Sequence, residues 1–338
     1  MILHLDLKDN GYDIIIEHGC LNKAGEYLNL NRNVLIVSDT GVPFEYVETL
    51  LKQCPKGHYL LIEQGEVNKN LDNYAKILKE LCDLRFNRKD CVIALGGGVV
   101  GDISGFAASC YMRGIDFYNI PTTSLSEIDS SIGGKTAIDF GGLKNIVGTF
   151  YQPKKVLIDP DTLKTLSERH LYNGLVEGLK MAACFDEDTF DIFMNEDIIS
   201  HLDEIICKSL LIKKDVVEKD EKESGLRKVL NFGHTVGHGI EVSTDDILHG
   251  ESVALGMLVM ASKEVREKLL SIYPKMNIRT DYDIDVKKVM EALRHDKKGN
   301  DDGVDCVVVN RIGSFEIVKM TYEEIEERLT DCKEVMGR

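Results

Sequence analysis

The stretch CVIALGGGVVGD, residues 91–102, decides the fold that this sequence predicts. Its first five residues are apolar, as in a buried β-strand, and the glycines that follow open a helix expected to continue through Ile103 to Cys110. The letters match G-x-G-x-x-G, in which glycines let the backbone approach a pyrophosphate and the helix N-terminus holds its negative charge. A glycine-rich turn also occurs for geometry alone. The strand and helix context favours a nucleotide site.

One part of the dinucleotide fingerprint is missing, because no acidic residue ends a second strand about 20 residues downstream. Asp39, which ends the apolar run at 34–38, lies upstream instead. It could bind a ribose from a strand that precedes the glycine loop, or it could be a turn aspartate before Thr40 and Gly41. The residues leave both interpretations open.

Length and composition set the class of protein. With 338 residues, the chain is long enough for two domains with buried cores. Its formal net charge of -16 argues against a nucleic-acid or acidic-membrane partner. Nine scattered cysteines without a C-x-x-C pair are typical of a reduced protein, and neither a signal peptide nor a membrane-spanning stretch is recognisable. We therefore expect a cytoplasmic protein.

The sequence predicts an α/β fold, with a mostly parallel, Rossmann-like domain over residues 1–155 and a mainly α-helical domain over residues 156–338. In the first part, strand-like runs alternate with helical stretches such as 71–86. These strands are expected at 13–17, 34–37, 58–62, 91–95 and 117–120, with an edge strand at the N-terminus. In the second part, apolar residues recur with helical spacing. These helices are expected at 161–183, 185–194, 199–220, 235–242, 250–268, 286–295 and 322–329, with one hairpin at 306–309 and 315–318.

Three histidines lie close together in the helical half. His234 and His238 are four residues apart and would share one helix face, and His249 follows at the start of a helix. Two histidines with one carboxylate form an ordinary catalytic zinc set, and the same ligands suit cobalt or iron. Glu177 interrupts an apolar stretch and is the favoured carboxylate, with Lys180 on the same face. The alternative is histidines satisfied at helix ends and a surface Glu–Lys pair, and spacing does not decide which two histidines bind.

Beyond these features, the chain resembles the 3-dehydroquinate synthase family of sugar phosphate cyclases, essentially from end to end. The resemblance rests on several long motifs that occur in the family's order. They are residues 96–102, YMRGIDF (111–117), IPTT (120–123), DSSIGGKT (129–136), KN (144–145), FYQP (150–153), GLR (225–227), NFGHTVGH (231–238) and LHGE (248–251).

This resemblance implies an NAD-binding domain over 1–155, a helical metal- and substrate-binding domain over 156–338, and a homodimer. It implies NAD as a recycled catalyst and a divalent metal, zinc or cobalt. The family's substrate is 3-deoxy-D-arabino-heptulosonate 7-phosphate. The implied reaction converts it to 3-dehydroquinate and phosphate in the shikimate pathway of aromatic amino-acid biosynthesis. The steps are transient oxidation by NAD, phosphate elimination, reduction, ring opening and intramolecular aldol closure.

Residue roles also follow from the resemblance. The metal ligands match Glu177, His234 and His249, which leaves His238 to act on protons or phosphate. Glu223 and His238 match acid/base positions, and Asn231 matches a polar group beside the metal. Substrate-holding positions match Asp129, Lys135, Asn145, Lys180, Lys213, Arg227, Lys297 and Lys298, with Lys135, Lys180 and Arg227 also catalytic, and Arg113 reaching across the dimer. NAD contacts match Asp39, Glu66, Lys69, Gly96, Gly97, Gly98, Gly101, Asp102, Thr122, Thr123, Lys144, Thr162, Thr165 and Asn173.

One departure from the family bears on specificity. The loop DFGGL (139–143) stands where many members carry Asn-His-Pro-Leu-Gly, and we expect it beside the substrate. A sister sugar phosphate cyclase would use the same glycine loop and metal set with a different pocket. A metal-dependent polyol dehydrogenase of the same fold would show net hydride transfer. A non-catalytic nucleotide-binding module would not need Glu177, His234 and His249 together.

Overall fold

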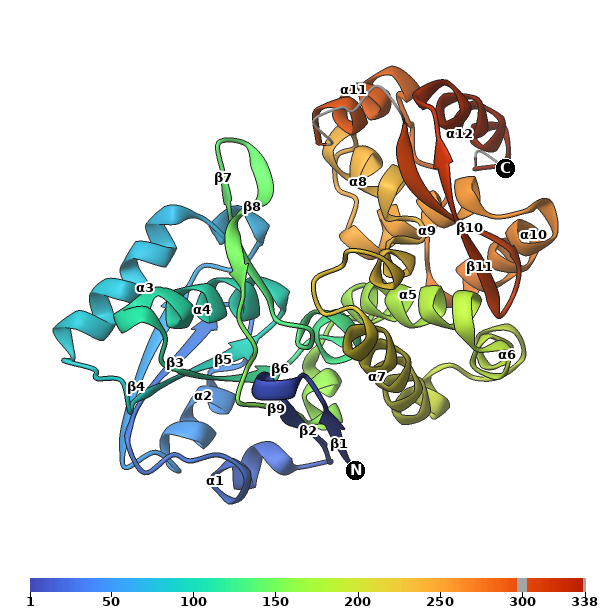
Figure 1. The fold of residues 1–338 in the computed structure, drawn as a ribbon. Helices are drawn as coiled ribbons and strands as arrows, with labels where there is room; N and C mark the ends of the chain where they lie inside the picture. Colours follow the sequence, from blue (N-terminus) through green and yellow to red (C-terminus); the bar gives the residue numbers. More distant parts are fainter. Residues whose placement is uncertain (297–302, 337–338) are drawn as a thin grey trace. The chain divides into compact units, whose positions relative to one another are not determined.

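The computed structural model describes residues 1–296 and 303–336 and divides into two compact units, Met1–Ser167 and Glu168–Arg338 (Figure 1). Lys297 and Lys298, for which the sequence predicts substrate contacts, lie outside the described residues. Within the described residues, no helix combines the length and apolar character needed to cross a bilayer.

A seven-stranded sheet forms the centre of the first unit and confirms the predicted α/β class. Its order is β1 (Ile2–Leu5), β2 (Tyr12–Ile16), β9 (Lys155–Ile158), β6 (Asp116–Pro121), β5 (Cys91–Gly96), β3 (Asn33–Asp39) and β4 (Lys56–Ile62). Neighbouring strands pair in parallel except β1, which pairs antiparallel with β2 at the edge. The carboxyl ends of the parallel strands therefore meet at one edge of the sheet.

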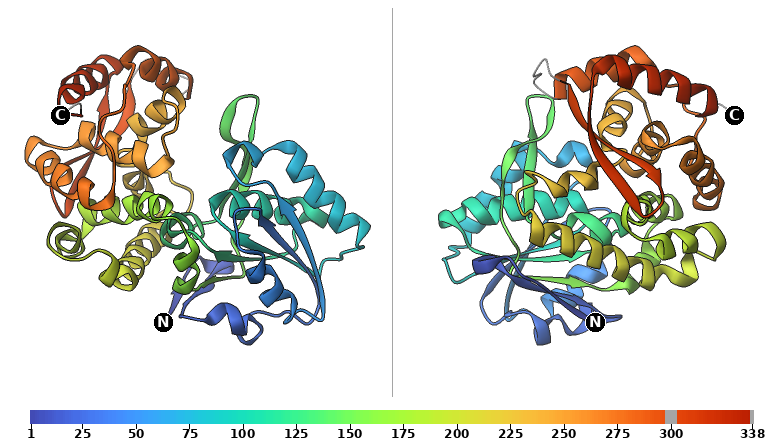
Figure 2. Two further views of the ribbon diagram at one scale, coloured as in Figure 1. Left: turned by 180° about the vertical axis from the view of Figure 1, so that it is seen from behind. Right: turned by 45° about the vertical axis from the view of Figure 1, so that its right-hand side comes forward.

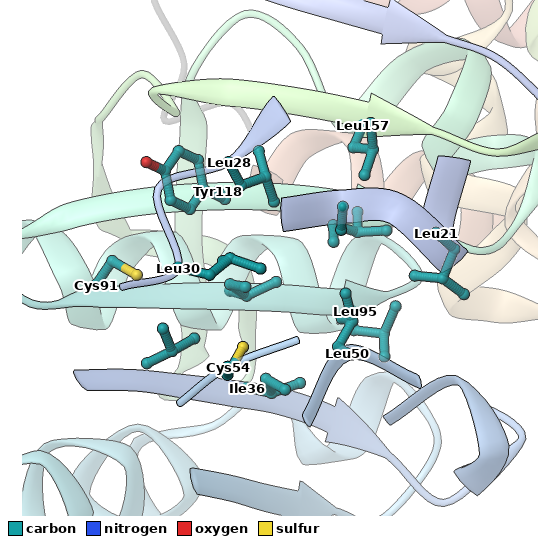
Figure 3. Packing of buried hydrophobic residues seen from close by; sticks show 14 of the residues in the cluster. Leu21, Leu28, Leu30, Ile36, Leu50, Cys54, Cys91, Leu95, Tyr118 and Leu157 are labelled. Atoms are coloured by element: carbon teal, nitrogen blue, oxygen red, sulfur yellow. The ribbon is translucent and has the colours of Figure 1, made fainter. Parts of the chain in front are cut away.

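The central strands β3 and β5 are buried on both faces, which accounts for their continuous apolar runs. Successive side chains of a strand point to opposite faces. On one face Ile36 and Leu95 pack with Leu50 of α2 (Phe44–Leu51), as Figure 3 shows. On the other face Leu35 and Val92 pack with side chains of α3 (Leu71–Asp83) and α4 (Gly98–Cys110). A short α1 (Ala24–Tyr27) completes the helices of this unit.

A β-hairpin that the sequence did not predict stands away from the sheet (Figures 1 and 2). Its strands are β7 (Lys135–Phe140) and β8 (Leu143–Phe150), which pair antiparallel. Strand β7 packs against α4, whereas every residue of β8 is exposed. Gly141 and Gly142, with φ of +62° and +80°, form the two-residue turn between them, because a turn of this hand requires positive φ at both positions.

The first unit extends further along the chain than the predicted boundary after residue 155. Strand β9 lies inside the sheet, between β2 and β6, and the 3-10 helix η6 (Pro160–Thr165) follows it. The side chain of Asp159 accepts hydrogen bonds from the backbone N–H groups of Gly19 and Leu21, both at 2.9 Å. These contacts tie residues up to Ser167 to the α/β unit.

The second unit is mainly helical, as the sequence predicts. Its helices are α5 (Glu168–Phe185), α6 (Glu187–Asn195), α7 (Leu202–Lys219), α8 (His234–Ser243), α9 (His249–Met260), α10 (Lys263–Ile272), α11 (Val286–Asp296) and α12 (Tyr322–Met336). The predicted hairpin is confirmed as β10 (Val304–Arg311) and β11 (Ser314–Met320).

Two helices predicted as single segments are interrupted. The segment 161–183 begins in η6, passes through extended backbone at Leu166 and starts again as α5 at Glu168. The segment 250–268 divides into α9 and α10, because Ala261 is extended and forms a bridge with Val309. The Ser262 side chain then accepts the N–H of Val265 at 3.3 Å and starts α10.

Candidate active site

The glycine loop joins the carboxyl end of β5 to the N-terminus of α4. Close packing explains its glycines: a Cβ on Gly96 would lie 2.7 Å from Cγ2 of Val100, and one on Gly101 would lie 3.2 Å from Nδ2 of Asn119. Gly97 is the N-cap of α4, and no side chain within the described residues caps this helix. Its first N–H groups are therefore suited to an anionic ligand such as a pyrophosphate.

Asp39 ends β3, the strand that pairs with β5. It therefore lies at the same edge of the sheet as the glycine loop, although β3 precedes β5 in the chain. This strand order explains why no acidic residue follows the loop in the sequence. The Oδ1 atom of Asp39 accepts the N–H of Gly41 at 2.8 Å, so the turn interpretation is confirmed. Burial raises the pKa of Asp39 despite this hydrogen bond; ribose binding stays a prediction.

The predicted threonines lie at the same edge. Thr122 and Thr123 directly follow β6, and the N–H of Thr122 donates to the carbonyl of Gly96 at 3.0 Å. Thr162 and Thr165 lie in η6, which follows β9. Asp39, the glycine loop and these four threonines thus come from the carboxyl ends of four neighbouring strands, β3, β5, β6 and β9.

Lys69 links this edge to the start of α4. Its side chain is buried, and Nζ lies 2.6 Å from Oε1 of Glu66 and 3.3 Å from Oδ2 of Asp102. Although burial works against the ammonium charge, these carboxylates raise the pKa of Lys69. Burial in turn raises the pKa of Asp102 to about 6, against the opposing effect of Lys69. All three residues are among the predicted NAD contacts, and the structure brings them together.

The hairpin carries three further predicted residues. Lys135 begins β7, and Lys144 and Asn145 lie in β8 just after the glycine turn. Asn145 has φ of +54°, and its N–H donates to Oδ1 of Asp139 at 2.8 Å. Asp129 lies in the short helix η5 (Ser126–Ser130), a few residues before β7.

Arg113 lies elsewhere in the α/β unit. Helix α4 starts at the carboxyl edge of the sheet and runs for 13 residues, or about 20 Å, at 1.5 Å per residue. Arg113 follows its end, is exposed and precedes the amino end of β6. It therefore lies at the opposite edge of the sheet from the glycine loop.

A second cluster lies within the helical unit. The Oε1 atom of Glu177 in α5 lies 3.5 Å from Nε2 of His234 and 3.7 Å from Nε2 of His249. This oxygen is buried and has no hydrogen-bond partner within residues 1–296 and 303–336. The other oxygen, Oε2, accepts a hydrogen bond from Lys180. His238 also has a ring nitrogen within 4.8 Å of those of His234 and His249, but it is exposed.

The other nitrogen of each imidazole fixes which atom offers its lone pair. Nδ1 of His234 lies 3.3 Å from the carbonyl oxygen of Phe232, and Nδ1 of His249 lies 3.1 Å from Oε2 of Glu241. Because these oxygens are acceptors, each Nδ1 carries the proton and each Nε2 points its lone pair towards Glu177. Two Nε2 atoms and a buried carboxylate oxygen without a hydrogen-bond donor fit a divalent metal ion.

The protonation of the two histidines follows from their surroundings. Burial, together with the charge of Lys180 and the neighbouring imidazoles, holds the pKa of His234 well below its usual value. For His249 burial also opposes the charge, but the carboxylates of Glu241 and Glu177 outweigh it and raise its pKa. His234 is therefore neutral near pH 7, the form that coordinates a metal.

Glycines bring the two histidine helices close together. A Cβ on Gly256 of α9 would lie 1.9 Å from the carbonyl oxygen of Gly233, which is the N-cap of α8 and has φ of +79°. A Cβ on Gly237 would lie 2.9 Å from the carbonyl oxygen of Ser252. Only this close approach lets His234 on α8 and His249 on α9 face the same carboxylate.

Asn173 on α5 holds the start of α9. Its Oδ1 accepts the N–H groups of Gly250 at 2.7 Å and Glu251 at 3.3 Å. Glu251 in turn accepts two hydrogen bonds from Arg169, at 2.8 and 2.9 Å. The structure thus places Asn173 beside the predicted metal ligands, in the helical unit, and its predicted contact with NAD stays a prediction.

The predicted cations and acid/base residues of the helical unit lie on the same elements or beside them. Lys180 on α5, Lys213 on α7 and Arg227 are all buried. Glu223 precedes the 3-10 helix η8 (Leu226–Asn231), and its Oε1 accepts from Nδ2 of Asn231 at 2.7 Å. Their positive charges match an anionic ligand, in addition to the partners that they have within the protein, such as Glu177 for Lys180.

Comparison with known proteins identifies the family. Models of the 3-dehydroquinate synthase N-terminal and C-terminal domains match residues 59–173 and 174–299. A 3-dehydroquinate synthase of Clostridium kluyveri is 37% identical over 347 residues, which cover 96% of each chain. The chain belongs to the 3-dehydroquinate synthase family.

Solved structures share the fold of this family member. A 2-epi-5-epi-valiolone synthase of Streptomyces hygroscopicus, with NAD⁺ and Zn²⁺ bound, aligns with a TM-score of 0.88 and 27% identity over 98% of this chain and 99% of that one. A 2-deoxy-scyllo-inosose synthase aligns with a TM-score of 0.87 over 98% of this chain and 100% of that one. At 23% identity, the latter shows the fold alone.

The sequence analysis did not identify Glu241 as the hydrogen-bond partner of His249 in this synthase family member. Glu241 lies three residues after His238 and seven after His234 on α8, so helical periodicity places all three on one face. The spacing alone could have suggested it as a partner of a histidine. Its contact with His249 could not be foreseen, because that contact depends on how α8 and α9 pack.

Proposed function

We propose that the protein is a 3-dehydroquinate synthase, which converts 3-deoxy-D-arabino-heptulosonate 7-phosphate to 3-dehydroquinate and phosphate. The observation that carries the proposal is the buried Oε1 of Glu177 facing two imidazole nitrogens, in a chain that also contains the glycine loop of an NAD site. Metal and nucleotide sites together fit the family to which the chain belongs. The reaction is that of a phosphate-eliminating lyase in the shikimate pathway.

We assign NAD to the carboxyl edge of the sheet and the metal, zinc or cobalt, to Glu177, His234 and His249. The solved valiolone synthase, which binds NAD⁺ and Zn²⁺, supports both cofactors. When bound, NAD takes up a hydride from the substrate and later returns it, and the metal withdraws electron density from the substrate hydroxyl that is oxidised. No net NADH is formed in this cycle.

The residues of the chain bind and orient the substrate. Its phosphate and carboxylate carry negative charge, and the buried ammonium and guanidinium groups of Lys180, Lys213 and Arg227 supply matching positive charge. Lys135 and Asn145 on the hairpin and Asp129 before it are assigned the remaining contacts. An acidic chain of net charge -16 thus gathers cations where the anionic substrate binds.

Proton transfer is assigned to His238 and to Glu223. His238 is exposed beside the two histidine ligands, so its imidazole can reach a substrate group without coordinating the metal. Glu223 is oriented by the amide of Asn231 at 2.7 Å. A histidine and a carboxylate are ordinary groups for general acid and base catalysis near neutral pH.

We further propose a homodimer in which Arg113 acts on the substrate of the partner subunit. Arg113 lies at the opposite edge of its own sheet from the glycine loop. The exposed strand β8 offers a contact surface, because Ile146, Val147 and Phe150 are large apolar side chains in contact with solvent. We place the enzyme in the cytoplasm, where its nine free thiols would remain reduced.

The test combines the purified protein, NAD and zinc or cobalt with 3-deoxy-D-arabino-heptulosonate 7-phosphate. Release of phosphate together with the carbocyclic product, and no accumulated NADH, is the expected result. Accumulated NADH with a simple polyol would instead indicate a dehydrogenase. Turnover of a different sugar phosphate, with none of this one, would indicate a sister cyclase and would direct attention to residues 139–143.

A further inference from the structure

The loop between α7 and η8 carries two of the proposed functional residues. It runs from Asp220, the C-cap of α7, to Arg227 in η8 and includes Glu223. A loop normally varies in conformation unless side chains or the backbone hold it. Here the carboxylate of Asp220 makes several of the hydrogen bonds that hold it.

Asp220 accepts four hydrogen bonds from this loop. Its Oδ1 accepts the N–H of Ser224 at 2.9 Å and the hydroxyl of Ser224 at 3.1 Å. Its Oδ2 accepts the N–H of Gly225 at 2.7 Å and the N–H of Arg227 at 3.0 Å. The carboxylate therefore satisfies three backbone N–H groups and one hydroxyl of the segment between α7 and η8.

The loop needs such a support because its backbone is strained. Glu223 has φ of +60°, a region that non-glycine residues occupy rarely. This conformation directs its side chain to Asn231, whose Nδ2 lies 2.7 Å from Oε1 of Glu223. The guanidinium of Arg227 donates to the carbonyl oxygen of Glu221 at 2.5 Å. Glu223 and Arg227 thus lie in one loop whose conformation is held by hydrogen bonds.

We propose that Asp220 is a positioning residue, which fixes Glu223 and Arg227 in the geometry that turnover requires. The inference rests on the proposed function, since it assumes that these two residues act on the substrate. Asp220 itself makes no contact with substrate in this proposal and acts through the loop.

The carboxylate of Asp220 is ionised at neutral pH. Partial burial raises the pKa of Asp220, but the N–H donors of Arg227, Gly225 and Ser224 and the Ser224 hydroxyl lower it further, to about 2. The strong, charge-assisted form of the four hydrogen bonds is therefore present at neutral pH.

The experiment compares Asp220→Ala and Asp220→Asn with a matched control, Asp215→Asn, in the full-length enzyme loaded with NAD and zinc. Asp215 lies on the same helix but is exposed and pairs only with Lys219, at 2.6 Å, among the contacts of the described residues. Asn at 220 keeps one oxygen but places N–H groups against the N–H donors of Gly225 and Arg227. We expect kcat to fall roughly 10- to 100-fold in both Asp220 variants, and to remain within twofold in the control.

Three further readouts separate positioning from a general loss of structure. Zinc affinity and NAD affinity should be unchanged in both Asp220 variants, because no residue from 220 to 227 is among those assigned to the metal or to NAD. Hydrogen exchange should speed up at the N–H groups of Ser224, Gly225 and Arg227. In a Glu223→Gln background, Asp220→Ala should lower kcat by a smaller factor than it does in wild type, because the positioning of Glu223 no longer contributes.

Two outcomes would overturn the inference. One is a kcat within twofold of wild type in Asp220→Ala. The other is loss of zinc binding in parallel with kcat, with additive effects in the double variant, which would show a general structural role. A failure of the proposed function gives a different pattern, because the wild-type protein itself would then release no phosphate from the substrate.

Discussion

At the residue scale, Glu177 divides its two oxygens between different partners. Oε2 accepts from Lys180, whereas the buried Oε1 faces the Nε2 atoms of His234 and His249. Each imidazole is in turn held at Nδ1, by a backbone carbonyl for His234 and by the Glu241 carboxylate for His249. The geometry of the proposed metal ligands is therefore set by residues that are not themselves assigned to the metal.

Replacing Glu241 with Gln should weaken zinc binding. The amide cannot replace the charge that orients His249 and raises the basicity of its ring, and loss of such a partner typically costs roughly 10- to 100-fold in metal affinity. Titration against a chelating indicator measures it. Glu264→Gln is the control, because Glu264 is exposed and its ion pair is with Lys268, at 3.0 Å. Equal zinc affinity in both variants would contradict the assignment.

Asp102 should make stability depend on pH. Its pKa is about 6 in the folded protein and 3.8 in its reference state. Because the folded pKa of this acid is raised, the native state binds the proton more tightly, so protonation of Asp102 favours the folded form below about pH 4. That advantage is lost as the pH rises from about 4 through 6.

The difference in melting temperature between wild type and Asp102→Asn isolates this effect. Without NAD, the wild-type value should fall relative to the variant between pH 4 and 6 and then run parallel to it up to pH 8. A difference that is constant across this range would show that the folded pKa is not raised.

At the element scale, the start of α9 depends on a close contact with α5. The Cβ of an alanine at 250 would lie 1.9 Å from the carbonyl oxygen of Asn173. Since this atom belongs to a helix backbone, it cannot move aside cheaply. The contact fixes where His249, the first residue of α9, meets Glu177.

Gly250→Ala should therefore destabilise the helical unit by roughly 1–3 kcal/mol, as overpacking does, and should weaken zinc binding at the same time. Thermal unfolding with and without zinc measures both. Gly25→Ala is the control, because the nearest atom to its added Cβ is the Gln53 side-chain oxygen at 3.8 Å. A stable Gly250→Ala variant with normal zinc affinity would show that α9 can shift without disturbing the site.

Periodicity and apolar runs predicted most elements but missed those whose environment is unusual. Strand β9 is only four residues long, which is too short for its apolar residues to show a strand periodicity. Strand β8 is wholly exposed and shows no alternation of buried and exposed residues. The helical spacing of apolar residues over 250–268 concealed the break at Ala261, where the backbone forms a bridge with Val309, 48 residues away. Such contacts between distant segments leave no local pattern.

In the candidate site, too, residues within sequence motifs were predicted, whereas residues that depend on contacts between distant segments were not. Motifs and resemblance were enough to predict Glu177, His234, His249 and the glycine loop. The orienting partners, Glu241 and Asp220, depend on how helices and loops approach one another, and the residues alone did not predict them. Asp39 was predicted with two open interpretations, and its hydrogen bond to Gly41 confirms the turn.

At the scale of the whole molecule, the proposed dimer makes each active site depend on two chains. Arg113 would serve the partner's site, whereas His249 would serve its own. A dimer formed from one Arg113→Ala chain and one His249→Ala chain would contain one site with both defects and one with neither.

Neither variant should be active alone, but mixing and re-equilibrating equal amounts should restore about a quarter of wild-type activity, since half the dimers would be mixed and each would have one intact site. Phosphate release measures it. Native mass spectrometry of the mixed chains tests whether subunits exchange. Exchange without complementation would place Arg113 outside the partner's site.

Strand β9 also has a consequence for synthesis of the chain. The hairpin of β1 and β2 leaves the ribosome before the other strands of its sheet, yet it joins that sheet through β9, which starts at Lys155. The strands between them, β3 to β6, can pair as they emerge. The first strands made must therefore wait for the last strand of the unit and join the sheet at the end, with their apolar residues Ile14 and Ile15 exposed to chaperones in the interval.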